Sequence, residues 1–217
     1  MYGYASENGY NVMLLDLLGK SLQELMVELG RPFSLKTVVM LGQQLLDRVE
    51  RLHEKQFLHR DIKPENLLMG LGKNSNLLYM IDMGLAKKYM KDGKSISNVG
   101  IHAPYKDEQC LRGTIKYLSI NTHQGVEQSR RDDIETVGYV LVYLLKGMLP
   151  WQNVKFRDDK DKYRTIMERK MAITAEELCI GFPGEFAQFI NYSRRLKYEE
   201  QPDYTYLRKL LDTVRER

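Results

Sequence analysis

The stretch FLHRDIKPENLLMG, residues 57–70, sets charged and polar side chains among leucines and decides how the rest of the chain is interpreted. Asp61 is followed by Lys63 two positions later and by Asn66 five positions later. A core strand would exclude these polar side chains, whereas a solvated loop would not need so many leucines. The stretch therefore predicts a functional loop on an apolar support.

The residues on either side predict the elements that hold this loop. Apolar residues between positions 34 and 53 fall near helical spacing and predict a long amphipathic helix before the loop. Residues 77–82, LLYMID, predict a strand after it, ending at Asp82. Residues 87–113 are polar and lack periodicity, so they predict a long functional loop.

Further elements follow from apolar runs and capping patterns. Residues 11–17, NVMLLDL, predict a short buried strand. Ser21 followed by Glu24 forms a capping box that predicts the start of a helix, and residues 174–177 repeat the pattern. Residues 132–145 leave almost no polar face, which predicts a helix at the centre of the domain. The chain thus reads as one mainly helical domain with a few strands at its front end.

Composition and charge restrict the class of protein. A chain of 217 residues, 43% of them hydrophobic and 29% charged, is typical of a globular protein of one or two domains. The net charge of +4 is too small to predict nucleic acid as the main partner, and two cysteines predict neither a disulfide framework nor a zinc site. The N-terminus has no basic n-region, and the longest apolar run, residues 136–145, is too short to span a bilayer. We therefore expect a soluble protein of the cytoplasm and/or nucleus, without a nucleic-acid or membrane partner.

The side chains of the loop suit phosphoryl transfer. That reaction needs a carboxylate that orients the attacking hydroxyl and accepts its proton, a cation on the transferred phosphate, and oxygen ligands for magnesium. Asp61 fits the first role and Lys63 fits the second. Asn66 and Asp82 fit the third role, as magnesium ligands.

These motifs resemble those of a known family. His-Arg-Asp-x-Lys-x-x-Asn followed by Asp-x-Gly is similar to the catalytic and metal-binding loops of eukaryotic protein kinases, and Lys63 resembles the serine/threonine class. Five further stretches resemble the casein kinase I family, in which Ser-Ile-Asn replaces the usual Ala-Pro-Glu: residues 67–77, 113–123, 127–139, 149–152 and 202–211. The resemblance implies ATP and Mg²⁺ as cofactors. It also implies an α+β, protein-kinase-like fold, with a remnant N-lobe strand and hinge over residues 1–19 and a mainly helical C-lobe over residues 20–217.

The resemblance assigns an adenine site to residues on both sides of the chain's first helix. Asp16 to Leu18 would form the hinge that binds adenine through backbone groups, with Leu15 at the gatekeeper position. Leu68 and Ile81 would line the floor of the adenine pocket.

Around the loop, the resemblance implies residues that support the chemistry. Thr114 would support the catalytic carboxylate and the lysine beside it, and Asp133 would pin the loop from the central helix. His59 and Arg60 would give the loop structural support. Met83 stands where the family usually has Phe, and as a flexible apolar side chain it is expected to pack in the same way.

Lys116 and Lys162 are the basis for the substrate class that we expect. In the family that the chain resembles, a basic groove binds phosphate or acidic groups on primed protein substrates, and Lys116 and Lys162 match two of its positions. Lys116 stands where the family usually has Arg, so a bidentate phosphate contact becomes a point charge. Exposed lysines are also ordinary solvated surface, and this alternative stays open.

Two hypotheses about activity follow from what the sequence lacks. No G-x-G-x-x-G segment and no strand with a V-A-I-K-like lysine precedes the catalytic loop. The chain is either a casein kinase I-like enzyme whose N-lobe lies upstream, or a catalytically inactive, truncated C-lobe that acts as a protein-binding module. The preserved polar residues of the loop favour the first hypothesis, and the absent glycine loop favours the second. We expect the chain by itself to transfer phosphate inefficiently and to associate through its unpaired first strand.

Overall fold

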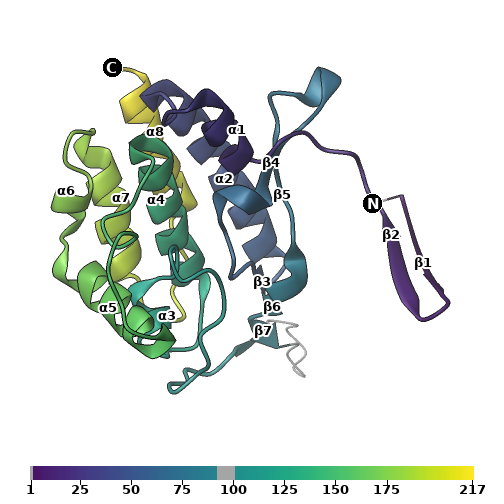
Figure 1. Ribbon diagram of the computed structural model, residues 1–217. Helices are drawn as coiled ribbons and strands as arrows, with labels where there is room; N and C mark the ends of the chain where they lie inside the picture. Colours follow the sequence, from purple (N-terminus) through teal and green to yellow (C-terminus); the bar gives the residue numbers. More distant parts are fainter. Residues whose placement is uncertain (1, 92–100) are drawn as a thin grey trace.

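The computed structural model describes residues 2–91 and 101–217. Its helices gather into one body, and an N-terminal hairpin extends away from that body (Figure 1). The loop of residues 59–66 lies at the side of the body that carries the short strands. The fold is therefore α+β, with helices providing nearly all of the core.

The hairpin consists of β1 (Gly3–Glu7) and β2 (Tyr10–Leu14), which pair antiparallel. Asn8 and Gly9 form its turn with φ angles of 51° and 79°, and two successive residues with positive φ suit a tight turn that matches the twist of the strands. All of β2 is exposed, so the prediction of a buried strand over residues 11–17 is wrong. The apolar run does form a strand, but among the described residues β2 pairs only with β1, and its side chains face solvent.

The first two helices begin at caps that the sequence predicts. At α1 (Leu22–Leu29), the N–H of Glu24 donates to the Ser21 hydroxyl at 3.2 Å, and the Ser21 N–H donates to the Glu24 carboxylate at 2.7 Å. The predicted capping box is confirmed. The long helix α2 (Leu35–Glu54) begins after its N-cap Ser34, which confirms the helix predicted before the loop.

The centre of the body is α4 (Arg130–Lys146), in which residues 132–145 are all buried. Helices α2 and α7 (Gly184–Arg195) pack against it, and α8 (Tyr204–Arg215) packs against α2 and α7 (Figure 1). The predicted central helix is confirmed. Any polar side chain on α4 must therefore find its partners inside the protein.

Smaller helices complete the body. They are α3 (Ile120–His123), α5 (Asp159–Ala172) and α6 (Ala175–Leu178), the last with the capping box predicted at residues 174–177. Both cysteines are free: Cys110 is exposed, and Cys179 is buried in the core. None of the helices in the described ranges has the length and apolar character needed to cross a membrane.

The remaining strands are two or three residues long and form three antiparallel pairs. These are β3 (Phe57–Leu58) with β6 (Lys87–Lys88), β4 (Leu67–Met69) with β5 (Leu78–Met80), and β7 (Met90–Lys91) with β8 (Ile101–His102). β5 confirms the strand predicted within residues 77–82, although it is shorter. The long loop predicted over residues 87–113 contains β6, β7 and β8, and its residues 92–100 lie outside the described part.

Candidate active site

The loop between β3 and β4 is fixed from behind by the central helix. Asp133 of α4 accepts hydrogen bonds from the backbone N–H groups of His59 at 2.8 Å and of Arg60 at 3.0 Å. The His59 ring donates to the carbonyl of Ile81 at 3.0 Å, and the Arg60 guanidinium donates to the carbonyl of Leu85 at 2.7 Å. Arg60 has a φ of 67°, a left-handed conformation that a non-glycine residue keeps only where its surroundings impose it. The structure thus brings the predicted supporting residues together, and their functional role stays a prediction.

Asp133 also contacts His53 and, through it, Tyr204, two residues to which the sequence analysis gives no role. Its carboxylate lies 2.9 Å from Nε2 of His53, and Nδ1 of His53 lies 2.6 Å from the hydroxyl of Tyr204. Burial would raise the pKa of Asp133, but its hydrogen bonds and the nearby histidines hold the pKa below its ordinary value. One signal for this chain of contacts exists in the sequence: His53 follows Val49 by four residues, which places a polar ring on the apolar face of α2.

Asp61 is buried, and both oxygens of its carboxylate accept hydrogen bonds. Lys63 Nζ donates to Oδ2 at 2.7 Å, while the N–H and hydroxyl of Thr114 donate to Oδ1 at 2.8 and 2.7 Å. Lys63 Nζ also donates to Thr114 Oγ1 at 3.2 Å, so the three side chains form a closed triangle. Burial would raise the pKa of Asp61, but the hydrogen bonds from Lys63 and Thr114 outweigh it and hold the pKa below its ordinary value. The carboxylate is therefore ionised at neutral pH.

Asn66 and Asp82 are brought to neighbouring positions by the pairing of β4 with β5. The N–H of Ile81 donates to the carbonyl of Asn66 at 3.0 Å, and Asp82 follows directly. Asn66 donates through Nδ2 to the backbone carbonyl of Asp61 at 3.0 Å, which leaves its Oδ1 as the oxygen that can face a cation. Asp82 is exposed, and its carboxylate accepts one hydrogen bond, from the N–H of Gly84 at 3.1 Å.

A carboxylate and an amide oxygen are ligands of the kind that Mg²⁺ takes from proteins, so these two residues fit the predicted metal site. Within residues 2–91 and 101–217, no group of three or more His, Cys, Asp or Glu residues could hold a metal ion. Mg²⁺ commonly uses one or two carboxylates and fills its other positions with water and substrate phosphates. The roles of Asn66 and Asp82 stay predictions.

The first half of the predicted adenine site lies in the connection between the hairpin and α1. Leu15 is 56% exposed, and the carboxylate of Asp16 accepts a hydrogen bond from the hydroxyl of Tyr2 at 2.6 Å. Leu18 is half-buried. The structure therefore leaves two of these residues in contact with solvent, and their adenine-binding role stays a prediction.

The second half of the predicted adenine site lies on the body. Leu68 and Ile81 are half-buried, and the N–H of Gly19 donates to the carbonyl of Met69 at 2.8 Å, which ties the connection to β4 beside Leu68. Met83 does not pack as expected: it is 46% exposed, because the turn after Asp82 carries it outward.

Lys116 and Lys162 each lie over aromatic rings. Nζ of Lys116 is 3.5 Å from the ring centroid of Tyr143 and 4.9 Å from that of Tyr117, and Nζ of Lys162 is 5.1 Å from that of Phe156. Burial lowers the pKa of Lys116 to about 8. A ring face attracts an ammonium group and does not neutralise its charge. Each lysine thus has its own aromatic contact, and an anion site that uses both stays a prediction.

A cavity of about 360 Å³ lies beside the catalytic loop, and its basic residues are ones that the sequence analysis did not group together. It is lined by Arg60, Lys87 and Arg112, together with Glu127. Lys87 pairs with Glu127 at 2.7 Å, so the four side chains keep an excess of positive charge. The three basic residues are far apart in the sequence, and only the fold brings them to one cavity.

Comparison with known families agrees with this geometry. The family described as protein kinase domain matches residues 1–202 of the chain. The chain belongs to the protein kinase domain family. The predicted α+β, kinase-like fold with a reduced sheet is confirmed by this match together with the dominance of helices over short strands. Protein kinase domains in general use ATP and Mg²⁺ and act on protein substrates. Residues 59–66, with Thr114 and Asp82, are therefore the candidate active site of this kinase domain.

Proposed function

We propose that the chain is the catalytic part of a serine/threonine protein kinase of casein kinase I type. It would transfer the γ-phosphate of ATP to Ser or Thr residues of acidic or primed protein substrates. The observation that carries the proposal is the position of Lys63 Nζ, which donates to Asp61 Oδ2 at 2.7 Å and to Thr114 Oγ1 at 3.2 Å. A lysine two residues after the catalytic aspartate resembles the serine/threonine class, and Ser-Ile-Asn at residues 119–121 supports the casein kinase I type.

Each residue of the triangle has a distinct task in this proposal. The ionised carboxylate of Asp61 orients the substrate hydroxyl and accepts its proton. The N–H and hydroxyl of Thr114 hold the carboxylate in place, and the ammonium of Lys63 stabilises negative charge on the transferred group. ATP would supply that group when bound and would leave as ADP once the bond to the γ-phosphorus breaks, and Asn66 and Asp82 would hold its Mg²⁺.

The proposed substrate class rests on positive charge around the loop. Phosphate or carboxylate groups beside the target Ser or Thr would meet Lys116, Lys162 or the basic residues of the 360 Å³ cavity. The modest net charge of +4 supports proteins as partners, with no nucleic-acid or membrane partner. We place this activity in the cytoplasm and/or the nucleus.

An Asp61→Asn variant tests the catalytic assignment. Because we expect the chain by itself to transfer phosphate inefficiently, the kinetic measurements use residues 1–217 fused behind a protein kinase N-lobe. In that fusion, transfer of labelled phosphate from ATP to casein, measured with Mg²⁺ present, should fall by roughly a hundredfold or more, the scale of losing a general base. Asp47→Asn is the matched control, because that carboxylate forms only a half-exposed ion pair with Arg208 at 3.1 Å and should change little. Transfer by Asp61→Asn at the rate of the unchanged protein would refute the assignment.

The alternative function, a catalytically inactive protein-binding module, is favoured by one observation. The hairpin presents exposed apolar side chains such as Val12 and Leu14, which could serve as a contact surface. The same assay separates the two functions, because a binding module gives no transfer above the Asp61→Asn background.

A further inference from the structure

Lys170 of α5 is buried where a lysine is rarely found. Its side chain is 0% exposed, although lysine is almost never fully buried without a charged partner. Within the described part of the chain it forms no ion pair at 4 Å or less, and the nearby charge of Glu135 only partly offsets its burial. Burial lowers the pKa of Lys170 far below its ordinary value. Burial is unfavourable for the amine of Lys170. The hydrogen bonds that the amine makes therefore indicate which part of the protein it stabilises.

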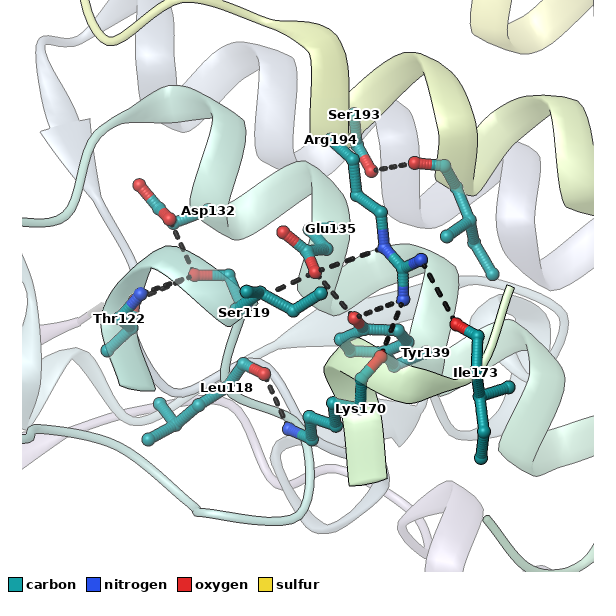
Figure 2. A network of polar contacts seen from close by, with 12 residues as sticks. Leu118, Ser119, Thr122, Asp132, Glu135, Tyr139, Lys170, Ile173, Ser193 and Arg194 are labelled. Atoms are coloured by element: carbon teal, nitrogen blue, oxygen red, sulfur yellow. Dashed lines mark hydrogen bonds and ion pairs between the residues drawn. The ribbon is translucent and has the colours of Figure 1, made fainter. Parts of the chain in front are cut away.

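Both hydrogen bonds of Lys170 go to one segment. Nζ donates to the carbonyl of Leu118 at 2.6 Å and to that of Ile115 at 3.0 Å. Figure 2 shows the side chain reaching from α5 to Leu118. The rings of Tyr139 and Trp151 complete the surroundings, each with its centroid 5.1 Å from Nζ. The amine thus lies over two ring faces and is aimed at two backbone carbonyls.

Trp151 contacts the same segment. It is fully buried, and its Nε1–H donates to the carbonyl of Lys116 at 2.8 Å. Its ring meets that of Tyr139 edge to face at 5.0 Å, which fixes its orientation. Lys170 and Trp151 together therefore pair three of the four carbonyls of residues 115–118.

This segment needs such partners because it is neither helix nor strand. Residues 115–117 form a turn, and residues 113, 114 and 118 lie in neither a helix nor a strand. Regular structure therefore does not pair the carbonyls of residues 115–118, and buried carbonyls must be paired by other groups. At its start, Gly113 has a φ of 108°, and a Cβ there would lie 2.4 Å from the carbonyl oxygen of Arg60. Thr114 follows, with both of its donors on Asp61. The segment thus lies between the catalytic loop on one side and Lys170 with Trp151 on the other.

We propose that Lys170 and Trp151 are positioning residues of the active site, which act through the carbonyls of residues 115–118 to hold Thr114 against Asp61 and Lys116 toward the substrate. The role rests on the proposed function, since it assigns the segment to substrate binding and to support of the base. Lys170 contacts neither substrate nor nucleotide in this proposal. Its effect passes through the backbone that it holds.

The alternative is that Lys170 only holds the helices together. The neighbouring contacts of Arg194 distinguish this alternative from a positioning role. Arg194 donates to the hydroxyl of Tyr139 at 3.1 Å and to the carbonyl of Ile173 at 3.4 Å, and it lies 3.7 Å from Glu135 (Figure 2). These contacts join α4 to α7 without using the amine of Lys170. Losing that amine should therefore free residues 115–118 and leave the helix contacts in place.

The test uses Lys170→Met, which keeps the chain length and removes the donors, and Trp151→Phe, which keeps a ring and removes the N–H. The kcat/KM for a peptide substrate should fall roughly ten- to hundredfold for Lys170→Met, the scale of a small misplacement at a reacting centre, and less for Trp151→Phe. The KM for the peptide should rise, and the KM for ATP should stay unchanged. Arg169→Met is the matched control: Arg169 is the exposed preceding residue of α5, and its loss should leave both constants unchanged.

Amide hydrogen exchange gives a second readout that needs no activity. In both variants exchange should rise in peptides covering residues 113–118 and stay unchanged in peptides from α2 and α4. Unchanged exchange in that segment would overturn the proposal, as would an equal rise throughout the body. A local rise in a chain that transfers no phosphate, even unsubstituted, would support the positioning and count against the proposed function instead.

Discussion

At the scale of single residues, two charged groups near the catalytic loop have pKa values displaced by their surroundings. Asp61 is 8% exposed, yet its pKa is lowered because Lys63 and Thr114 hydrogen-bond the carboxylate. Lys116 has no comparable acceptor, so burial lowers its pKa to about 8. The two displacements predict different pH limits: Asp61 sets the acidic limit of activity, and Lys116 sets the alkaline limit of the preference for primed substrates.

Thr114→Val should move the acidic limit. The substitution removes the hydroxyl that donates to Asp61 at 2.7 Å, and a hydrogen bond to a charged group contributes about 1.5–3 kcal/mol. Without it the pKa of Asp61 rises, so the acidic limb of the kcat/KM profile shifts to higher pH. Thr114→Ser keeps a hydroxyl and should keep the original limb. Coinciding limbs for all three proteins would show that the hydroxyl does not tune the carboxylate.

Lys116 predicts how the preference for primed substrates depends on pH. As the pH rises through about 8, Lys116 loses its proton, so the KM for a phosphorylated peptide should rise while that for an unprimed peptide stays level. The phosphate of the peptide keeps its charge throughout, since its second pKa is near 6. Lys116→Arg stays protonated and should remove the pH dependence. An equal rise for both peptides would identify Lys116 as ordinary surface.

At the scale of elements, α4 connects the catalytic loop to the C-terminal helix. Asp133 accepts from two backbone N–H groups of the loop and contacts His53 of α2, which in turn contacts Tyr204 of α8. All three side chains are buried. The catalytic loop is therefore fixed by three helices. Removal of the Asp133 carboxylate should weaken the contacts of all three.

Asp133→Asn should destabilise the fold strongly. The amide places an N–H₂ group against donors, which leaves buried groups unpaired, and breaking a buried polar network of this kind costs about 3–5 kcal/mol. Tyr204→Phe removes only the outer contact and should cost about 0.5–1.5 kcal/mol. Denaturant unfolding followed by circular dichroism measures both values. Equal losses for the two variants would contradict a central position of Asp133.

The same scale shows which elements the sequence predicts well. Local signals suffice for α1, whose capping box is complete within Ser21–Glu24, and for α4, whose residues 136–145 are apolar on nearly all sides. Asp61, Lys63 and Asn66 are also found, because their spacing lies within one loop. Lys170 is missed, since it lies among the charged residues of α5 and only the position of Trp151 and of the turn segment reveals why it is buried. Contacts between segments that are distant in the sequence produce no local sequence pattern from which they could be predicted.

At the scale of the whole molecule, the hairpin and the body differ in how their apolar side chains are covered. Val12, Met13 and Leu14 of β2 are each more than half exposed, although the pattern of residues 11–17 is that of a buried strand. The sequence pattern of a strand indicates which side chains could be buried. It does not indicate which other segment would cover them. Both outer edges of this two-stranded sheet are also free of pairing within the described part. Such an edge is a template for association.

We predict that the protein associates in a concentration-dependent way through this hairpin. Val12→Lys with Leu14→Lys should shift it toward a monomer, because the charges replace the apolar side chains of one face of β2. Ser6→Lys with Asn11→Lys adds the same charge on the opposite face without removing apolar area, and should have the smaller effect. Analytical ultracentrifugation measures the mass. A monomer at every concentration before any substitution would contradict the prediction.

The two free cysteines differ in exposure, so their alkylation rates can measure how fast the packed body opens. Burial raises the pKa of Cys179 to about 12, so this thiol is both shielded and un-ionised, while Cys110 is exposed. An alkylating reagent should modify Cys110 at once and Cys179 only as fast as the packing around α6 separates. One mass spectrum taken over time would then report surface chemistry and core opening side by side. When each opening leads to modification, the reciprocal of the Cys179 rate gives the lifetime of the closed state, and no introduced label is needed.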